Sequence, residues 1–376
     1  MIGWEFPPRV TGGLGRACEG LVRGLLGHGC RISLVLPRGR PANAPSRLRR
    51  PGEASRRFRI FRLDTRLAPY RSTPLYGPGL GREVLRLAQR VSEIGSREDF
   101  DVIHAHDWMT YPAALELRRV TGKPFVAHVH STEFARSGED VDPFISVVER
   151  EGLRRADRVV CVSRRTAGVV RRRYGVADGR IRVVHNAIDP AAGPVRSFPH
   201  DRPLVLFAGR LTRQKAPASF LEAAARVLAR RPDVEFVMAG AGDRLEFLHQ
   251  RARELGIQDR VAFPGFVSPA RLEELYRRAT IYALPSVAEP FGLTVLEATR
   301  AGVPSIVSRQ AGVTEVLSSL VPVDPGDAAG LAVRMLFLLN APVYRWLLAR
   351  GAADEIRTLS WSRAAARCLA VYAEVC

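Results

Sequence analysis

The sequence predicts an α/β protein made of two doubly wound domains, each with a mostly parallel sheet. The chain has 376 residues, which exceeds the length that one hydrophobic core usually serves. Short apolar runs alternate with longer helical patterns along almost all of it, and this alternation is typical of βαβ units. The series stops at a stretch rich in Pro, Ala and Gly, roughly residues 189–203, and then restarts. We interpret this stretch as the interdomain linker.

Each half of the chain contains five runs that we expect to be strands buried on both faces. In the first half they cover residues 31–36, 101–104, 125–129, 158–162 and 181–184. In the second half they cover residues 204–208, 234–239, 260–263, 281–284 and 305–308. Helices are expected over about 18–26, 218–230 and 271–278, and a terminal helix is expected after residue 359. Residues 40–57 lack apolar periodicity, so we expect a mobile loop there.

The composition is that of a globular protein, with 46% hydrophobic and 25% charged residues. The net charge of +19 is compatible with a partner that is nucleic acid, anionic lipid or an anionic substrate. However, only two of the 57 basic residues are lysines, Lys123 and Lys215, and the arginines are scattered. Short clusters at 154–155, 164–165 and 171–173 fall on expected helices, so we interpret them as solvated faces. We therefore expect no nucleic-acid partner, while peripheral contact with an anionic membrane stays open.

The cysteines and the hydropathy pattern bear on the compartment. The five cysteines are odd in number, widely spaced and form no C-x-x-C pair, so neither a disulfide framework nor a zinc site is indicated. The sequence has no apolar run of about 18 residues, which a membrane-spanning helix needs, and no charged and then hydrophobic leader at its start. These features predict a cytoplasmic protein, with peripheral membrane contact as the remaining alternative.

A glycine-rich run near the N-terminus is the first candidate binding motif. Gly12 and Gly13 precede an apolar helical pattern, and glycines at a helix start let backbone N–H groups approach a phosphate. A structural turn is the commoner explanation of a short glycine run, so this motif alone is weak evidence.

Polar side chains gather where two strands of the first half end. His104, His106 and Asp107 follow one strand, and ligands of open α/β sheets bind at the carboxyl ends of strands. A metal site is the less favoured interpretation, because the spacing lacks the i, i+4 pairing of a helical zinc motif and no Cys or Glu stands nearby in the sequence. His128 and His130 alternate at the end of the next strand and so share one face. We select His130 as functional and regard the other as a possible core histidine.

The second half contains cations and carboxylates at two further strand ends. Arg210 and Lys215 lie five residues apart, and two fixed cations suit a diphosphate. A lysine in a chain that almost always uses arginine indicates a position that requires a compact ammonium. Glu289 and Glu297 lie eight residues apart around a glycine turn that should begin a helix. Backbone N–H groups of residues 292–295 could bind phosphate there, while the carboxylates could accept hydrogen bonds from sugar and ribose hydroxyls.

Together these motifs resemble the retaining glycosyltransferases of family 4, which have the GT-B fold, and especially their glycogen and starch synthase-like members. The resemblance covers nearly the whole chain. Its most specific element is the E-x7-E string from Glu289 to Glu297, accompanied by Gly-Gly-Leu-Gly, His-Ala-His-Asp-Trp, Arg210 with Lys215, and the string His-Asn-Ala-Ile-Asp at 185–189. The resemblance implies two Rossmann-like domains that face a cleft. It also implies an N-terminal acceptor-side domain over 1–190, a nucleotide-sugar-binding domain over 200–356, and a C-terminal helix, 359–376, that crosses back to complete the first domain.

The resemblance also implies an activity: transfer of a hexose, glucose above all, from a nucleotide sugar to a glucan or to another carbohydrate or lipid-linked acceptor. The anomeric configuration would be retained, and neither a metal nor a cofactor would be needed; the donor would be linked to ADP, UDP or GDP. His130, Arg210, Lys215 and Glu289 would be catalytic, with the two cations neutralising the departing diphosphate. Nucleotide-sugar contacts would come from Gly12, Gly13, Asp107, Asn186, Gly209, Phe291, Gly292, Leu293, Thr294 and Glu297.

Two departures from the family pattern and two rival functions remain. Ala216 stands where relatives usually have Gly, which would restrict the loop if a positive φ were needed there. The first strand is shorter than in relatives, because the chain opens at Met1-Ile-Gly-Trp. The rival functions are a sugar-nucleotide epimerase of the same fold and a basic protein that binds nucleic acid or anionic membranes. For the transferase, we expect Lys215→Ala and Glu289→Ala each to abolish most transfer while the fold stays intact.

Overall fold

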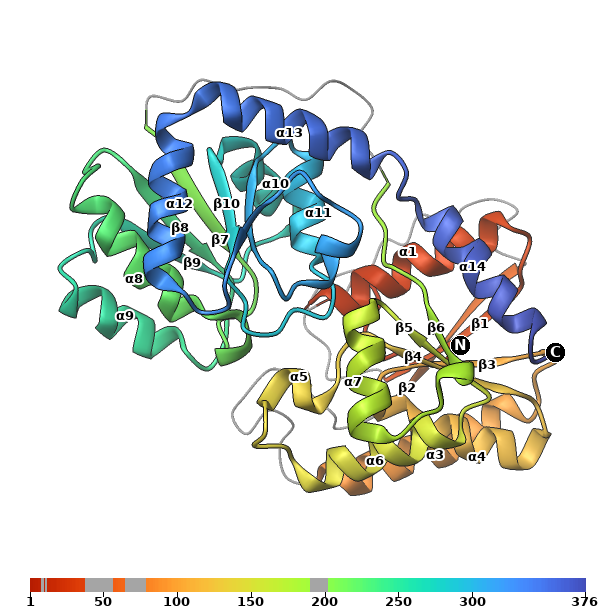
Figure 1. Cartoon of the computed structure of the whole chain (residues 1–376). Coiled ribbons are helices and arrows are strands. Elements are labelled where there is room, and N and C mark those ends of the chain that lie inside the picture. The colour runs from red at the N-terminus through yellow and green to blue at the C-terminus, as the bar shows by residue number, and fades with distance from the viewer. Residues whose placement is uncertain (8–9, 11, 38–56, 65–78, 190–201) are drawn as a thin grey trace. The chain divides into compact units, whose positions relative to one another are not determined.

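The computed structural model describes residues 1–7, 10, 12–37, 57–64, 79–189 and 202–376 (Figure 1). The predicted loop at 40–56 and most of the predicted linker lie outside the described residues. The chain forms two compact units, one of Met1–Ala187 with Trp361–Cys376, the other of Ile188–Ser360. We call them unit 1 and unit 2. Both contain parallel sheets, which confirms the predicted fold class.

Among its described residues, unit 1 has six strands: β1 (Ile32–Pro37), β2 (Phe58–Leu63), β3 (Ile103–His106), β4 (Phe125–Val129), β5 (Arg158–Cys161) and β6 (Ile181–Val183). They form a pair, β1-β2, and a sheet in the order β3-β4-β5-β6, and every pairing is parallel. Ile2 joins the two because it bridges Val35 of β1 and Ala105 of β3, both in parallel. The predicted short first strand is therefore present as a single bridging residue between β1 and β3.

The helices of unit 1 are α1 (Gly13–Gly27), α3 (Leu80–Gly95), α4 (Tyr111–Thr121), α5 (Glu133–Ser137), α6 (Pro143–Arg155), α7 (Arg164–Tyr174) and α14 (Trp361–Ala373). Helices α3, α4 and α6 pack together, and α1 packs against the C-terminal α14 (Figure 1). Two glycines make the second contact possible. A Cβ atom at Gly20 would lie 2.1 Å from the Trp361 ring, and one at Gly24 would lie 2.3 Å from the Trp361 carbonyl oxygen. The terminal helix thus returns to unit 1, as predicted.

In the part of unit 2 that the structure describes, six strands form one parallel sheet: β7 (Leu204–Ala208), β8 (Glu235–Ala239), β9 (Val261–Gly265), β10 (Ile281–Leu284), β11 (Ser305–Ser308) and β12 (Val321–Val323). Its helices are α8 (Pro217–Leu228), α9 (Leu245–Glu254), α10 (Pro269–Arg278), α11 (Leu293–Arg300), α12 (Ala328–Asn340) and α13 (Pro342–Ile356). The strand order is β9-β8-β7-β10-β11-β12. In chain order this is 3-2-1-4-5-6, the order of a doubly wound dinucleotide-binding fold.

Several sequence predictions can be compared directly with these elements. Strands β4, β7, β10 and β11 have the predicted bounds, whereas β3 begins and ends two residues later than predicted because its two histidines are buried. Strands β2 and β12 were not predicted. The arginine clusters at 154–155, 164–165 and 171–173 are all exposed, which confirms their interpretation as solvated faces. Within the described part of the chain, no single helix is both long and apolar enough to cross a bilayer.

Candidate functional site

The strand order of unit 2 marks where a ligand would bind. The strand order reverses between β7 and β10: these two strands are parallel neighbours, and successive strands are added outward from β7 on one side and from β10 on the other. In open α/β sheets, ligands bind beyond the carboxyl ends of the strands at this switch point. The loop after β7 carries Gly209, Arg210 and Lys215, and the loop after β10 carries Glu289. Four of the predicted site residues therefore lie on the two loops that flank the switch point of unit 2.

A buried ion pair connects these two loops. The Lys215 Nζ atom binds the Oε2 atom of Glu289, and the two side chains are only 15% and 6% exposed. Ser286 Oγ donates to the same carboxylate oxygen at 3.4 Å. The Gln214 carbonyl oxygen also accepts a hydrogen bond from Val287 N at 2.9 Å, so backbone and side chains fix the loops together. The ammonium predicted to bind a diphosphate is thus held in place by the predicted sugar-binding carboxylate.

Arg210 lies at the other side of the β7 loop and is half-buried. Its backbone carbonyl oxygen accepts a hydrogen bond from Thr212 N at 2.9 Å, and Leu211 N donates to Ala241 O at 3.0 Å. These contacts attach the β7 loop to the loop after β8. Two glycines of that second loop, which we did not identify from the sequence, allow the close approach. A Cβ at Gly240 would lie 1.8 Å from the Gly209 carbonyl oxygen, and one at Gly242 would lie 2.3 Å from the Leu211 carbonyl oxygen.

The residue after Lys215 has a strained backbone. Ala216 has φ 51° and ψ 48°, in the left-handed region where a Cβ atom is unfavourable and glycine is preferred. The position at which relatives usually have glycine therefore does need a positive φ, and alanine adopts it here. Ala216 is also the N-cap of α8, so the strain occurs at the point where the chain turns from the lysine into the helix.

Helix α11 begins at the second loop with its N-terminus formed by the E-x7-E string. Gly292 is its N-cap, with φ 112°, and Leu293 and Thr294 form the first turn. The N–H groups of such a turn have no partner within the helix and favour an anion. The loop is anchored by Gly312 N, which donates to Glu289 O at 3.0 Å, and by Val313 N, which donates to the carbonyl of the buried Phe291 at 2.7 Å.

Two tyrosines that the sequence did not reveal stabilise this region. The Tyr282 hydroxyl donates to Ala208 O at 3.0 Å and lies 2.8 Å from Thr294 Oγ1, so it connects the end of β7 with the first turn of α11. The Tyr276 hydroxyl donates to Glu297 Oε2 at 3.1 Å. Glu297 is half-buried rather than a free surface residue. Its carboxylate is oriented by Tyr276 of α10.

In unit 1, four histidines stack side by side: two on β3, one on β4, and one directly after β4. We call His104, His106, His128 and His130 the histidine stack. The rings of the last two lie 4.3 Å apart between centroids, and those of the first two 4.5 Å apart. His104 Nε2 lies 3.0 Å from His128 Nδ1, and His106 Nδ1 lies 2.9 Å from His130 Nε2. The Tyr372 hydroxyl of α14 binds His104 Nδ1, so the terminal helix closes one end of the network.

Burial keeps the histidine stack neutral. It lowers the pKa of His130 to about 3, and the pKa values of the other three fall well below their ordinary value, mainly through desolvation and then through their mutual repulsion. Neutral rings could serve as metal ligands, and Cys18 of α1 comes within 4.8 Å of His106 and His130 ligand atoms, although the sequence offered no cysteine near them. Four of the eight ring nitrogens bind one another in two pairs, whereas the buried Nε2 atoms of His106 and His128 and the Nδ1 atom of His130 have no hydrogen-bond partner among the described residues. We interpret the stack as a hydrogen-bonded network that orients His130 and leaves its Nδ1 atom for a ligand.

Asp107 directly supports His130. Its Oδ1 atom accepts hydrogen bonds from the backbone N–H groups of His130, at 2.7 Å, and Ser131, at 3.3 Å. It is buried and has φ 59°, an unusual backbone conformation for a residue other than glycine. Desolvation raises the pKa of its carboxyl to about 7, against the opposing effect of Arg136 and these hydrogen bonds. The structure thus gives Asp107 a positioning contact, while its predicted contact with a ligand remains a prediction.

The remaining predicted residues of unit 1 lie at separate strand or helix ends. Gly12 is the N-cap of the 15-residue helix α1, with extended backbone, and a Cβ atom there would meet nothing within 4 Å. Gly13 is exposed at the first helical position, and Asn186 is buried after β6. Asp142 is the N-cap of α6, where its side chain accepts a hydrogen bond from Ile145 N at 3.1 Å.

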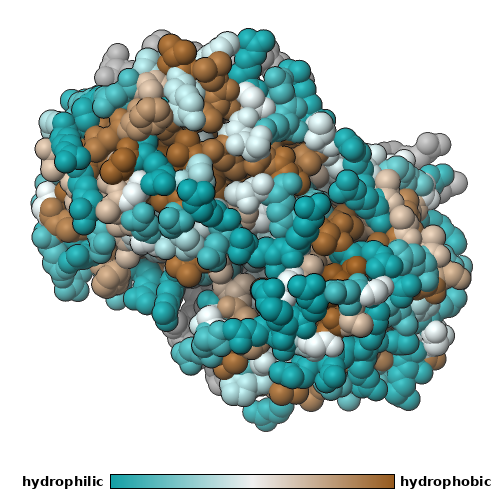
Figure 2. Space-filling view, in the orientation of Figure 1, coloured by the Kyte–Doolittle hydropathy of each residue, from teal (hydrophilic) through white to brown (hydrophobic). Residues whose placement is uncertain are grey.

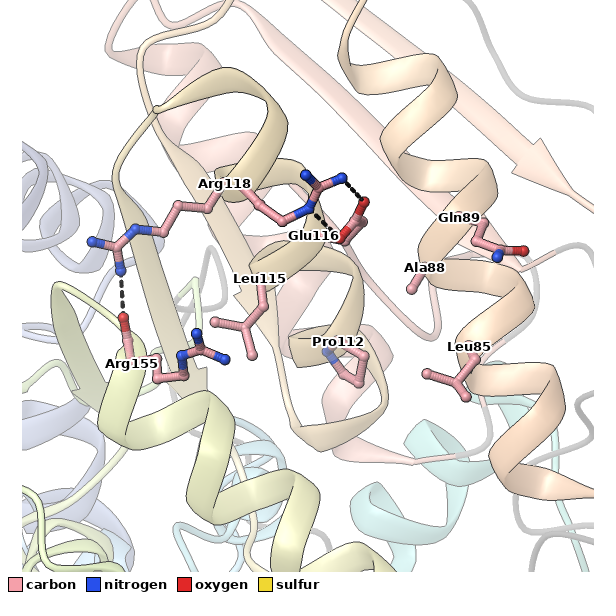
Figure 3. A pocket seen from close by; sticks show the side chains of 9 residues that line it. Leu85, Ala88, Gln89, Pro112, Leu115, Glu116, Arg118 and Arg155 are labelled. Atoms are coloured by element: carbon pink, nitrogen blue, oxygen red, sulfur yellow. Dashed lines mark hydrogen bonds and ion pairs between the residues drawn. The ribbon is translucent and has the colours of Figure 1, made fainter.

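A cavity of about 880 Å³ lies between α3, α4 and the end of α6 in unit 1 (Figure 3). Leu85, Pro112 and Leu115 form its apolar part. Its arginines are already engaged, since Arg118 donates to a backbone carbonyl of Arg155 and Arg119 pairs with a neighbouring glutamate on α4. None of the predicted site residues lines this cavity, so we do not include it in the candidate site.

Comparisons with known proteins bear on the family and the fold of the chain. A family model described as Glycosyltransferase Family 4 matches residues 11–192, and one described as Glycosyl transferases group 1 matches residues 193–350. A glycogen synthase of Mycobacterium tuberculosis is 29% identical over 99% of this chain and 93% of its own length. D-inositol 3-phosphate glycosyltransferase 1 of Catenulispora acidiphila is 31% identical over 73% of this chain and 72% of its own. The crystal structure of Anabaena HepE in complex with UDP-glucose superposes with a TM-score of 0.73 and 18% identity, over 98% of both chains.

Proposed function

Since this chain belongs to glycosyltransferase family 4, with a group 1 domain in its C-terminal half, we propose that it transfers a hexose from a nucleotide sugar to a carbohydrate or lipid-linked hydroxyl. Glucose is the first candidate for the sugar, and a glucan is the first candidate for the acceptor. We further propose that the reaction retains the anomeric configuration and needs no metal. The glycogen synthase relative and the UDP-glucose complex of a structural neighbour support the choice of donor and sugar.

One observation carries this proposal: Lys215 and Glu289 are paired beside the N-terminus of α11 at the switch point of unit 2. A nucleotide diphosphate needs cations and N–H donors, and the sugar attached to it needs hydroxyl acceptors. This loop pair supplies both kinds of group at one place. When the bond between the sugar and the diphosphate breaks, negative charge grows on the leaving oxygen, and a preorganised ammonium stabilises that charge.

The other residues follow from this arrangement and from the family resemblance. We assign Arg210 to the diphosphate, Glu297 to the ribose, and His130 to the transferred sugar. A neutral imidazole can donate or accept a hydrogen bond to a hydroxyl without adding charge, and burial keeps His130 neutral at physiological pH. The five cysteines are all free, which suits a reducing compartment, so we place the reaction in the cytoplasm.

The direct test is nucleotide release from ADP-glucose, UDP-glucose, GDP-glucose and GDP-mannose, each with and without glucan. We expect release from one glucose donor that rises strongly when an acceptor is added. Proton NMR of the product then reports its anomeric configuration, and EDTA should leave the rate unchanged. Acceptor-independent conversion of the donor would instead support an epimerase, which the family assignment does not favour.

The two lysines of this chain provide a matched pair of variants. Lys215→Arg keeps the charge but replaces a compact ammonium by a broad guanidinium within a pair that is mostly buried. We expect transfer to fall about a hundredfold, the size of effect seen when one preorganised charge contact is lost. Lys123→Arg makes the same replacement at an exposed position and should have no effect. Equal activity of the two variants would remove Lys215 from the proposed mechanism.

A further inference from the structure

An exposed apolar surface covers the corner where α12 and α13 meet. Six large hydrophobic side chains contribute to it, and each is between 42% and 71% exposed: Val333, Phe337, Val343, Tyr344, Trp346 and Leu347. The two helices meet at 102°, and the rings of Phe337 and Tyr344 touch across the junction with centroids 5.3 Å apart. Figure 2 shows hydrophobic residues gathered over this part of unit 2. We call these six residues the α12–α13 corner.

Such a surface is unusual on a protein that faces only water. Monomeric proteins rarely expose large contiguous apolar patches, and those that occur mark interaction sites. The spacing explains why the side chains cannot be internal. Leu331, Met335 and Leu338 already fill the inner face of α12, and Leu348 and Ala352 that of α13. The corner residues lie on the outer faces, and nothing in the packing of unit 2 requires them to be apolar.

The charge around the corner selects the kind of partner. Between Asp327 and Asp354 the chain has three arginines and no acidic residue. The guanidinium of the exposed Arg350 lies over the Trp346 ring, 5.2 Å from its centroid. Aromatic side chains flanked by arginines suit the headgroup region of a bilayer, where the rings enter the interface and the cations meet lipid phosphates. The total charge of +19 favours an anionic surface and opposes association with a second copy of this chain.

We propose that the α12–α13 corner is a docking surface for an anionic lipid bilayer. Phe337, Trp346 and Leu347 enter the interface, while Arg350 contacts the lipid headgroups. The inference is independent of the transfer reaction, because none of these residues belongs to the candidate site. Among the described residues, no single helix is long and apolar enough to cross a bilayer, and α12 and α13 pass the test of length and composition only as a pair bent by 102°. Docking of their corner on the surface would bring the chain to a membrane, where lipid-linked acceptors would be present.

The test is co-sedimentation of the full chain with vesicles, either of phosphatidylcholine alone or of phosphatidylcholine mixed with phosphatidylglycerol. We expect binding to the anionic vesicles only. The double variant Phe337→Ala with Trp346→Ala should lower the partition coefficient about tenfold or more, since two large side chains no longer enter the interface. Phe247→Ala is the matched control, because Phe247 is 45% exposed on α9 and also has an arginine, Arg244, over its ring.

Tryptophan fluorescence gives a second readout that does not depend on a variant. The chain has four tryptophans, and Trp346 is 49% exposed while Trp4, Trp108 and Trp361 are at most 7% exposed. Insertion of Trp346 should therefore shift the emission to the blue when anionic vesicles are added. Three results would overturn the proposal: no binding by the natural chain, equal binding to neutral vesicles, or unchanged binding by the double variant. A dimer in sedimentation velocity that the double variant dissolves would assign the corner to self-association instead.

Discussion

The ion pair between Lys215 and Glu289 leads to the most informative prediction about stability. The side chains are 15% and 6% exposed. Replacing only one partner leaves the other charge desolvated without compensation, which costs about 3–5 kcal/mol for a buried pair. Lysine is the more exposed of the two, so we expect about 3 kcal/mol for Glu289→Gln and a somewhat larger loss for Lys215→Met. The expectation from sequence, that each alanine variant keeps its fold, stays a prediction, and a loss of this size would show as a lower unfolding midpoint of a folded variant.

The assay is thermal and urea unfolding of the two single variants and the double variant. For a unit of this size, 1 kcal/mol shifts the midpoint by roughly 2–4 °C, so each single change should lower the Tm of unit 2 by roughly 6–12 °C. The double variant has no unpaired charge left. It should be more stable than the sum of the single effects indicates, with a coupling energy of about 2 kcal/mol or more.

Measurements of nucleotide binding distinguish the contribution of the Lys215–Glu289 pair to stability from its contribution to binding of the nucleotide. A bound diphosphate would take the place of the lost carboxylate as partner of Lys215, so Glu289→Gln should keep its affinity for UDP or ADP in calorimetry while losing transfer. Lys215→Met should lose about tenfold or more of that affinity, as expected for one charge-assisted hydrogen bond. Additive stability effects together with equal nucleotide affinities in both variants would refute the reasoning.

Three further predictions concern backbone strain, the helix start in unit 1 and pH. Ala216→Gly should raise the stability of unit 2 by about 0.5 kcal/mol in urea unfolding, because the relieved left-handed strain exceeds the added freedom of the unfolded chain. The control Ala225→Gly, within α8, should lower the stability by about 1 kcal/mol. Gly12→Ala should leave the Tm unchanged, since a Cβ atom at this position would meet no other atom within 4 Å. If the N–H groups at the start of α1 approach a substrate, the variant should have a kcat/KM about tenfold lower. Unchanged kinetics would remove Gly12 from the site. The Tm of unit 1 should fall as the pH drops below about 6.5. Burial lowers the pKa values of the stacked histidines in the folded state, so below this pH the unfolded chain binds protons that the folded chain does not. Each histidine should then lower the free energy of unfolding by up to about 1.4 kcal/mol per pH unit. Asp107 has the opposite effect on stability, because its pKa is raised to about 7 in the folded state. Asp107→Asn should therefore make the Tm fall more steeply with decreasing pH. A Tm of unit 1 that does not change with pH would contradict the burial of the histidine stack.

The strands could be predicted where they are buried on both faces, and not at the edges of the sheets. Central strands such as β4, β7 and β10 are continuous apolar runs because helices cover both sides. Strand β2, Phe58–Leu63, alternates apolar residues with arginines and is mostly half-buried at one edge. Strand β12 has three residues, one of them a proline, which an edge position tolerates. Edge strands lack the double burial that makes a strand recognisable in sequence.

The residues of the candidate site likewise fall into those that the local sequence predicts and those that it does not. The positions of Lys215 and Glu289 at strand ends follow from the local pattern, so their approach at a switch point could be anticipated. Gly240, Tyr276 and Tyr372 could not, because each acts through a contact with a segment distant in sequence. Glycine is needed at position 240 because the carbonyl oxygen of Gly209 occupies the place of a side chain. The sequence around Gly240 does not predict this contact.

Each unit contains a residue with a strained backbone next to a residue that we assign to catalysis. Among the described residues, Asp107 and Ala216 are the two that have a positive φ without being glycine. Such conformations cost about 1–3 kcal/mol and persist only where the surroundings enforce them, most often at functional sites. Asp107 follows β3 and holds the backbone of His130, and Ala216 directly follows Lys215 in the loop after β7. In both units, then, the strained residue lies in the loop after a strand and adjoins or contacts a residue that we assign to catalysis. If the strain had no function, glycine or a relaxed turn would serve equally well at both positions, so its occurrence at these two places independently supports the assignment of His130 and Lys215.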